Sequence, residues 1–419
     1  MAFLAILLSI LTMSRTLASR KKRIQGAKSF RVALLVESSR NYGRGVLRGI
    51  AKYAHLHGQW SCFIEERELH GGIPAWLRTW KGHGIIARIE DRQMATELAR
   101  LGHPVVDVLG NSRFDGIPTF DTDACAVAKV AADFFLQAGF QHFAFCGYQK
   151  IPFSEQRESA YSSYLAERGK KTSIFAPPLP QGSRSHIRAI ERLGLSMVKS
   201  IAQWLKKQPR PLALFACNDV CAQQVLNACR ENGIKVPEEV AVMGMDNDDV
   251  LCSLCYPPLT SVEPDTERIG FEAATLLDRM MRGKHSHSEL KLVPPIQIVE
   301  RTSTDVVPIE DPITVQAVRF IRDHMGSGIA VKDVLAHVNR SRTDMEQRFR
   351  RHLKRSIHSE ILRLRMERVG GLLRQTDLNL NQIAMRAGFA TAAHLCRLFQ
   401  HHFHQTPTLY RKSSAKIGD

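Results

Sequence analysis

From Arg31 onward, short apolar runs alternate with amphipathic helical segments, and this alternation constrains the fold more than any other feature of the chain. The runs at 31–38 (RVALLVES), 84–89 (GIIARI) and 105–109 (VVDVL) are apolar at nearly every position. Such runs are typical of strands that are buried on both faces of a parallel sheet. The segments 43–58 and 91–102 between them have helical periodicity. The order predicts βαβ units and an α/β domain.

A second round of the same pattern begins near Asp123, so we expect two α/β lobes joined by crossovers. Together they would form one bilobed ligand-binding body over residues 30–305. The elements predicted for this round are helices at 124–139, 154–169, 220–233 and 265–283, strands at 142–147, 172–176, 211–219 and 240–248, and a last strand at 296–301.

Ligands of open α/β sheets bind in the crevice at the carboxyl ends of the strands. A neutral polyol such as a sugar needs carboxylate acceptors and planar guanidinium donors there. An aspartate that follows a strand serves equally often as a helix N-cap, so this second interpretation stays open for the two aspartates. The candidates that this rule selects are Ser38, Arg40, Asn41, Arg88, Arg157, Asp219 and Asp246.

Motifs of known catalytic sites do not occur in the sequence. The glycines of NYGRGVLRG (41–49) have the wrong spacing for a dinucleotide-binding loop, and no Walker A, GxSxG or HExxH pattern is found. The nine cysteines form no CxxC pair and no zinc-type spacing with histidine, and the histidines of QHHFHQ (400–405) lie in a basic helical stretch. We therefore expect no enzyme activity, no metal site and no cofactor, in a reducing compartment.

The net charge of +17 is concentrated at the two ends of the chain. Residues 1–30 carry six Lys and Arg and no acid, and residues 309–419 carry 19 against 10 acidic residues. The stretch between them, 31–308, is nearly balanced, with 33 basic and 31 acidic residues. A basic C-terminal module on a near-neutral body indicates a polyanionic partner, most often nucleic acid, although a solvated basic surface would carry the same charge.

The first 29 residues contain an apolar run at 2–12 and a basic cluster at 20–23 (RKKR). The run is too short to span a bilayer as a helix, and it lacks the positive charge that precedes the apolar region of a signal peptide. Three interpretations stay open for residues 1–29. They are a disordered extension or misassigned start, a membrane-associating segment, and an export signal.

Helical periodicity resumes at 313 after a polar linker at 306–312. A short helix at 331–338, a break at Asn339 and a longer Arg-rich helix at 341–353 form a helix-turn-helix pattern, with Ser341 as the expected N-cap. The pattern recurs at 380–389 and 391–403 after a connecting helix at 359–376, and Gly388 provides the turn. Two such units would present two recognition helices to successive major-groove turns of DNA.

The segment 313–412 resembles the DNA-binding domain of AraC-type transcription regulators in SRTDMEQRF (341–349), LNQIAMRAGFATAAHLCRLFQHHF (380–403) and QTPTLYRK (405–412). The body resembles the LacI-type, periplasmic-binding-protein-like sensor in FACNDVCAQQVL (215–226), VAVMGMDND (240–248) and PPLTSVEPD (257–265). The resemblance implies an α/β bilobed sensor followed by an all-α double helix-turn-helix domain, with a tail at 413–419. It also implies a cytoplasmic, nucleoid-associated homodimer that activates transcription from a double-stranded DNA operator under control of a small sugar, D-xylose or a related monosaccharide.

The resemblance assigns roles to residues of both helix-turn-helix units. Alanine and cysteine in the second recognition helix can offer only apolar contact to bases, so Arg397 is expected to carry most of the polar readout there. The side chains Met345, Phe349, Leu395, Phe399 and Phe403 are expected in the core. The implied base contacts are Arg342, Thr343, Glu346, Gln347, Ala392, Ala393, Cys396 and Arg397, and the implied phosphate contacts are Arg340, Arg350, Arg351, Lys354 and Arg355.

Arg88 differs from the family pattern, because the resemblance implies an acidic residue at this position in xylose-responsive members. The charge reversal leaves another pentose, a hexose or a modified sugar open as the effector. Two other kinds of protein also stay open. They are an exported solute-binding protein with a basic tail, and a sugar-acting enzyme on an α/β body.

Overall fold

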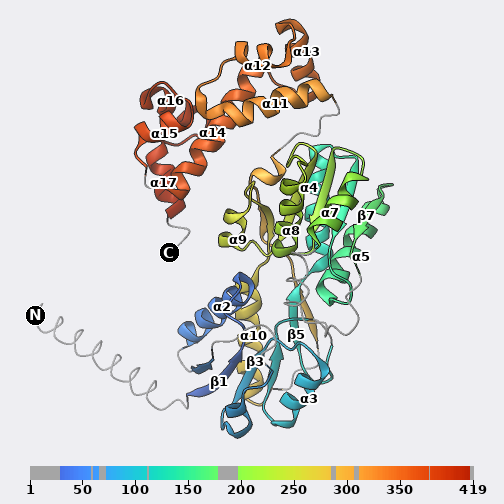
Figure 1. Ribbon diagram of the computed structural model, residues 1–419. Coiled ribbons are helices and arrows are strands. Elements are labelled where there is room, and N and C mark those ends of the chain that lie inside the picture. The colour runs from blue at the N-terminus through green and yellow to red at the C-terminus, as the bar shows by residue number, and fades with distance from the viewer. Residues whose placement is uncertain are drawn as a thin grey trace, which may run out of the picture.

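The computed structural model describes residues 29–57, 60–65, 72–110, 113–177, 197–284, 289–305, 311–376 and 378–415 (Figure 1). The molecule consists of two α/β lobes and a separate helical domain, which lie one after another in space, as Figure 1 shows. The predictions for residues 1–28 and for most of the linker, 306–310, lie outside the described residues.

Lobe 1 is built on a six-stranded sheet of order β11-β5-β4-β3-β1-β2. Both faces of this sheet are buried, because Val32 and Leu34 of β1 pack with α2 and α10, while Ala33 and Leu35 pack with η1 and α3. The elements of lobe 1 are β1 (Phe30–Leu35), α2 (Asn41–His57), β2 (Trp60–Ile64), η1 (Ala75–Thr79), β3 (Gly84–Ala87), α3 (Arg92–Arg100), β4 (Val105–Asp107), β5 (Thr119–Thr122), α10 (Thr266–Met281) and β11 (Leu290–Val293).

Lobe 2 has a second six-stranded sheet, of order β12-β10-β9-β8-β6-β7, with helices on both sides (Figure 1). Its strands enclose one continuous apolar core. The elements of lobe 2 are α4 (Ala124–Ala138), β6 (His142–Cys146), α5 (Pro152–Ala166), β7 (Thr172–Phe175), α7 (Val198–Lys206), β8 (Leu212–Ala216), α8 (Asp219–Glu231), β9 (Val240–Met245), α9 (Asp249–Leu254), β10 (Thr260–Glu263), β12 (Gln297–Val299) and η2 (Thr302–Thr304).

The predicted bilobed α/β fold is confirmed, and the strand pairings are parallel with one exception, β10 with β12. The antiparallel pair corrects the expectation of purely parallel sheets. The strand β12 enters lobe 2 directly from β11 of lobe 1, and it runs in the direction opposite to β10, beside which it lies.

The chain passes between the lobes three times, from β5 to α4, from β10 to α10 and from β11 to β12. The helix at 266–281 therefore belongs to lobe 1, although it follows strands of lobe 2. Its close packing on α2 depends on glycines, because a methyl group at Gly270 would lie 2.0 Å from the carbonyl oxygen of Val46, and one at Gly49 would lie 2.0 Å from that of Glu267.

The helical domain has two small cores, one at each half of its long central helix α14. Met345, Phe349, Leu395 and Phe399 are fully buried, as predicted, and Phe403 is partly buried. The elements of this domain are α11 (Pro312–His324), η3 (Met325–Ser327), α12 (Val331–Val338), α13 (Arg342–Leu353), α14 (Ile357–Gln375), α15 (Leu380–Arg386), α16 (Ala392–Phe403) and α17 (Pro407–Ala415).

Candidate functional site

Arg157 and Asp246 meet at the carboxyl ends of the lobe 2 strands. Arg157 Nη1 donates to the carbonyl oxygen of Cys217 at 2.5 Å, and its Nη2 lies 3.9 Å from Asp246 Oδ1. The Arg157 side chain is 9% exposed and that of Asp246 is 24% exposed, so the carboxylate is the more accessible partner. Asp246 has a φ of 107°, a left-handed conformation that is costly for a residue with a side chain and that concentrates at functional sites.

Asp219 lies beneath the loop that carries Asp246. Its Oδ1 accepts from Ser261 Oγ at 2.6 Å, and its Oδ2 accepts from the backbone N–H of Asp248 at 2.8 Å. Burial and the nearby charge of Asp246 raise the pKa of Asp219 to about 8. With both oxygens engaged inside the lobe and only 2% of its surface exposed, Asp219 supports the 246–248 loop from below.

Asn41 joins the two lobes. From the start of α2 in lobe 1, its side-chain amide donates to the carbonyl oxygen of Asn247 at 2.9 Å, and its backbone N–H donates to Asp248 Oδ2 at 3.3 Å. Ser38 and Arg40 lie in the turn before α2, where their carbonyl oxygens accept from the Arg44 side chain and backbone. The predicted residues of this turn therefore approach lobe 2 through Asn41.

Arg88 follows β3 and forms an ion pair with Glu37, which follows the adjacent strand β1. The Arg88 guanidinium also lies over the ring of Tyr42, 5.3 Å from its centroid. Burial, above all, raises the pKa of the Tyr42 hydroxyl, and the charge of Asp121 adds to this effect. Arg88 is thus held against the lobe 1 sheet by one carboxylate and one aromatic ring.

Asp121 lies in β5 between the two arginines. Burial raises its pKa to about 7, while the positive charges of Arg157 from lobe 2 and Arg88 from lobe 1 act in the opposite direction. Asp107 at the end of β4 has its pKa raised to about 6 by burial and accepts three backbone N–H groups, from Ile89, Leu109 and Gly110. Asp107 therefore holds the loops of the lobe 1 rim.

The structure brings together Arg157 and Asp246 on lobe 2 and Arg88 on lobe 1, and Asn41 bridges the lobes. Three neighbours of these residues were not predicted from the sequence, namely Glu37, Tyr42 and Asp121. Glu37 was counted as part of the first strand. Asp121 lies in a four-residue strand, TFDT, whose mixed polarity gave no strand signal, although the carboxyl-end rule would have selected it.

The two predicted helix-turn-helix units are present, as α12–α13 and α15–α16. Asn339 has a φ of 49° at the first turn, and Gly388 has a φ of 74° at the second. Ser341 and Thr391 cap the second helix of each unit by accepting backbone N–H groups at 3.2 Å. Each unit thus places its Arg-bearing helix after a rigid, capped turn.

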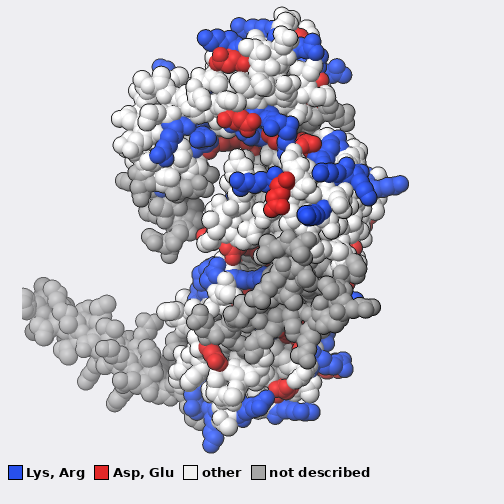
Figure 2. All heavy atoms as spheres, viewed as in Figure 1, with Lys and Arg blue, Asp and Glu red and all other residues white. Residues whose placement is uncertain are grey.

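The residues with predicted roles in base contact lie on one side of α13 and α16. Arg342, Thr343, Gln347, Ala393 and Arg397 are exposed, whereas Glu346, Ala392 and Cys396 are partly buried. Figure 2 shows Lys and Arg side chains gathered at the end of the molecule formed by α12 and α13.

The residues with predicted roles in phosphate contact differ in their surroundings. Arg340, Arg350, Arg351 and Lys354 are exposed. Arg355 is half-buried and donates to Glu360 Oε2 at 3.0 Å and to the carbonyl oxygen of Leu353 at 3.1 Å. It therefore contributes to the internal ion-pair network of the helical domain.

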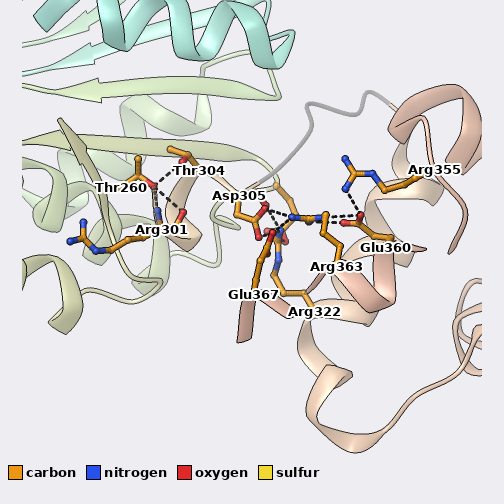
Figure 3. A network of polar contacts seen from close by, with 10 residues as sticks. Thr260, Arg301, Thr304, Asp305, Arg322, Arg355, Glu360, Arg363 and Glu367 are labelled. Atoms are coloured by element: carbon orange, nitrogen blue, oxygen red, sulfur yellow. Dashed lines mark hydrogen bonds and ion pairs between the residues drawn. The ribbon is translucent and has the colours of Figure 1, made fainter. Parts of the chain in front are cut away.

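A network of charged residues joins the sensor lobes to the helical domain (Figure 3). Arg363 of α14 donates to Asp305 Oδ1 at 2.9 Å, and Arg322 of α11 pairs with Glu238 and Asp305. Although burial opposes ionisation, the charges of Arg363 and Arg322 hold the pKa of Asp305 below its ordinary value. The last sensor residue before the linker is therefore anchored on two helices of the helical domain.

Arg301 connects this junction to the loop that carries Asp246. Its guanidinium donates to Asn247 Oδ1 at 2.9 Å, and its backbone N–H donates to Thr260 Oγ1 at 2.7 Å. Thr260 also hydrogen bonds to Thr304, next to Asp305, as Figure 3 shows. Polar contacts, joined through the peptide bond between Thr304 and Asp305, thus link the loop that carries Asp246 to the helical domain.

Within the described residues there is no cluster of side chains suited to a metal ion, and none of the described helices is both long and apolar enough to cross a membrane.

Three family models match successive parts of the chain. Residues 31–123 match the XylR N-terminal domain, residues 132–304 match the periplasmic binding protein-like domain, and residues 334–413 match a helix-turn-helix domain. The xylose operon regulatory protein of Escherichia coli K12 is 29% identical over 398 residues, which cover 93% of this chain and 99% of that protein. The xylose operon regulatory protein of Haemophilus influenzae is also 29% identical, over 391 residues, covering 91% and 98%.

Solved structures agree with these matches. A xylose-binding transcription activator, XylR, is similar with a TM-score of 0.74 and 28% sequence identity, covering 92% of this chain and 98% of its own. A LacI family transcriptional regulator from Enterococcus faecalis with bound ribose has a TM-score of 0.52 at 19% identity, covering 67% of this chain and 99% of its own. At that identity the second likeness supports only the fold of the sensor.

Proposed function

We propose that this chain is a sugar-responsive transcription regulator that joins a periplasmic-binding-protein-like sensor to an AraC-type double helix-turn-helix domain, and that its effector is D-xylose or a related monosaccharide bound between the two lobes. The observation that carries the proposal is the arrangement of Arg157 and Asp246 on lobe 2 opposite Arg88 and Asp121 on lobe 1. Guanidinium donors and carboxylate acceptors on both walls suit a ligand with hydroxyl groups on both sides of its ring.

Asp246 is the proposed main acceptor for the sugar, and Arg157 holds it in position. Asn41 and the neighbouring Ser38 and Arg40 would close over the ligand as the lobes approach. Asp219 has a supporting role, because its hydrogen bonds hold the 246–248 loop in its left-handed conformation.

A sugar that binds the closed lobes more tightly than the open ones shifts the sensor toward closure. We propose that this shift reaches the DNA through Arg301, η2 and Asp305, since these residues connect the 246–248 loop to Arg322 and Arg363. The helical domain would then change its orientation relative to the sensor, and with it the affinity for the operator.

The DNA would be read by α13 and α16 in two major-groove segments. Arg342, Gln347 and Arg397 have side chains that can hydrogen bond to base edges, while Ala393 and Cys396 can contact a thymine methyl group. Arg340, Arg350, Arg351 and Lys354 would bind phosphates and supply affinity without sequence preference. A homodimer would place two such domains on one operator, as an activator in the cytoplasm at the nucleoid, with no cofactor and no catalytic step.

Thermal unfolding of the purified full-length protein against D-xylose, L-arabinose, D-ribose and D-glucose tests the proposal. A sugar at 100 times its dissociation constant should stabilise the folded state by about 2.7 kcal/mol. Asp246→Ala should abolish that stabilisation and the sugar-dependent change in DNA binding, while sugar-free DNA binding stays intact. Loss of DNA binding together with the sugar response would indicate misfolding, and the absence of stabilisation by every sugar would overturn the proposal.

A further inference from the structure

Glu37 and Arg88 form the most deeply buried ion pair of the lobe 1 rim. The two residues end adjacent parallel strands, in which Leu35 is paired with Ala87. The side chain of Glu37 is 2% exposed and that of Arg88 is 16% exposed. A buried pair of this kind is fixed in place, because separating either charge from its partner would leave it without water or a counter-charge.

Each residue of this pair has one buried polar atom without a hydrogen-bond partner in the described part of the chain. Among the residues that the structure describes, Glu37 Oε2 and Arg88 Nε have no hydrogen-bond partner, although neither atom is accessible at the surface of the chain. Buried polar atoms are nearly always hydrogen bonded in native proteins, so an acceptor and a donor without partners on neighbouring residues indicate a group that binds there.

The pair lies near the boundary between the two lobes. Arg88 lies over the ring of Tyr42, and its charge acts together with that of Arg157 from lobe 2 on Asp121. Arg88 is paired with Glu37 and Arg157 with Asp246, and Asp121 adds a further acidic group beside both arginines. The cleft therefore offers many polar atoms without a net positive charge.

We propose that Glu37 and Arg88 act together as a specificity-determining clamp that selects an uncharged sugar with two adjacent hydroxyl groups and excludes sugars that carry a carboxylate. After a small displacement of the side chains that cover these two atoms, one hydroxyl would donate to Glu37 Oε2 and its neighbour would accept from Arg88 Nε. A sugar carboxylate in the same place would face Glu37 in a dry site, where repulsion between like charges is strong, and the guanidinium that could attract it is already paired. The inference rests on the proposed sugar-sensing function and deepens it.

Pentoses and hexuronates provide a direct test, because D-glucuronate has the ring hydroxyls of D-xylose with one added carboxylate. The full-length protein is titrated calorimetrically with D-xylose, L-arabinose, D-ribose, D-glucose, D-glucuronate and D-galacturonate. The wild type should bind at least one neutral sugar and neither uronate. Glu37→Gln should weaken neutral-sugar binding about tenfold or more and should gain uronate binding, because Arg88 then has no counter-charge.

Two further variants keep the test decisive. Glu267→Gln removes an exposed carboxylate that pairs with Arg48 at 2.9 Å, so it should leave sugar binding unchanged. The double variant Glu37→Gln with Arg88→Gln replaces the ion pair with two neutral amides and leaves no buried charge without a partner, so it should fold even where a single variant fails, and it should again reject uronates. Wild-type binding of a uronate as tight as that of a neutral sugar, or unchanged selectivity in Glu37→Gln, would overturn the clamp while sugar sensing stands. Binding of no sugar at all would overturn the proposed function and the clamp with it.

Discussion

Arg363 of the helical domain donates a 2.9 Å hydrogen bond to Asp305, the last described residue of the sensor before the linker. The same guanidinium also donates two hydrogen bonds, of 2.8 and 3.0 Å, to the carboxylate of Glu360 on its own helix. Arg363 thus belongs to the fold of one domain and to the junction with the other. Figure 2 shows acidic and basic side chains alternating along the side of the helical domain that faces the sensor, as such a junction requires.

Asp305→Asn should uncouple the two domains without unfolding either of them. The variant weakens the links to Arg322 and Arg363, while the bonds from Arg363 to Glu360 remain. Allosteric couplings are typically about 1–3 kcal/mol, and we expect the sugar-dependent change in operator affinity to fall by half or more. Fluorescence anisotropy with a DNA duplex selected from a random library, with and without sugar, measures this change. Asp323→Asn is the matched control, because its pair with Arg319 is exposed; a full sugar response in Asp305→Asn would limit the junction to a structural role.

Arg397→Ala should weaken specific DNA binding by about 1–3 kcal/mol and leave non-specific binding nearly unchanged, because its exposed guanidinium on α16 is the proposed polar base reader. The paired variant Arg350→Ala with Arg351→Ala should instead weaken binding to all sequences. It should also reduce the slope of affinity against salt concentration by about 2. Equal losses on specific and random DNA for Arg397→Ala would make it a phosphate contact.

The stability of the sensor should fall as the pH rises from about 4 to about 8. Burial raises the pKa of Asp219 from 3.8 to about 8 and that of Asp121 to about 7, so the folded state holds protons that the unfolded chain has already released. The stabilisation is complete below the ordinary pKa and is lost as the pH passes the raised values. Thermal unfolding from pH 5 to pH 9 measures the slope.

Asp219→Asn should flatten that slope, because the amide carries no charge at any pH in this range. Its oxygen can accept from the Asp248 N–H, and its NH₂ group can donate to Ser261 Oγ. Asp91→Asn serves as the control, since Asp91 caps α3 at the surface and asparagine caps helices equally well. A wild-type protein that is equally stable at pH 6 and pH 8 would contradict the prediction.

Gly388→Ala should destabilise the second helix-turn-helix unit by more than about 1 kcal/mol and reduce DNA affinity. Gly388 has a φ of 74°, and a methyl group there would lie 2.4 Å from the carbonyl oxygen of Met325. Gly371→Ala in the C-terminal part of α14 is the matched control, because an added methyl group meets nothing within 4 Å and alanine favours the helix. Urea unfolding of both variants compares them; equal stabilities would show that the turn can relax.

The two α/β lobes, both helix-turn-helix units, the Ser341 cap and the Gly388 turn could be predicted from the sequence, because they depend on local periodicity and on single residues. The carboxyl-end rule selected Asp246, which directly follows the apolar strand β9, and Arg157, which lies on the helix after the apolar strand β6.

Which side chains face one another could not be predicted from the sequence. The pairs Glu37–Arg88 and Arg363–Asp305 join residues 51 and 58 positions apart, and α10 returns to lobe 1 after the strands of lobe 2. No local pattern encodes such pairings, because they depend on the order of strands in the sheets and on where the chain crosses between lobes. The physical reason is that periodicity reports which face of an element is buried, whereas the identity of the neighbour on that face is set by the packing of the whole chain.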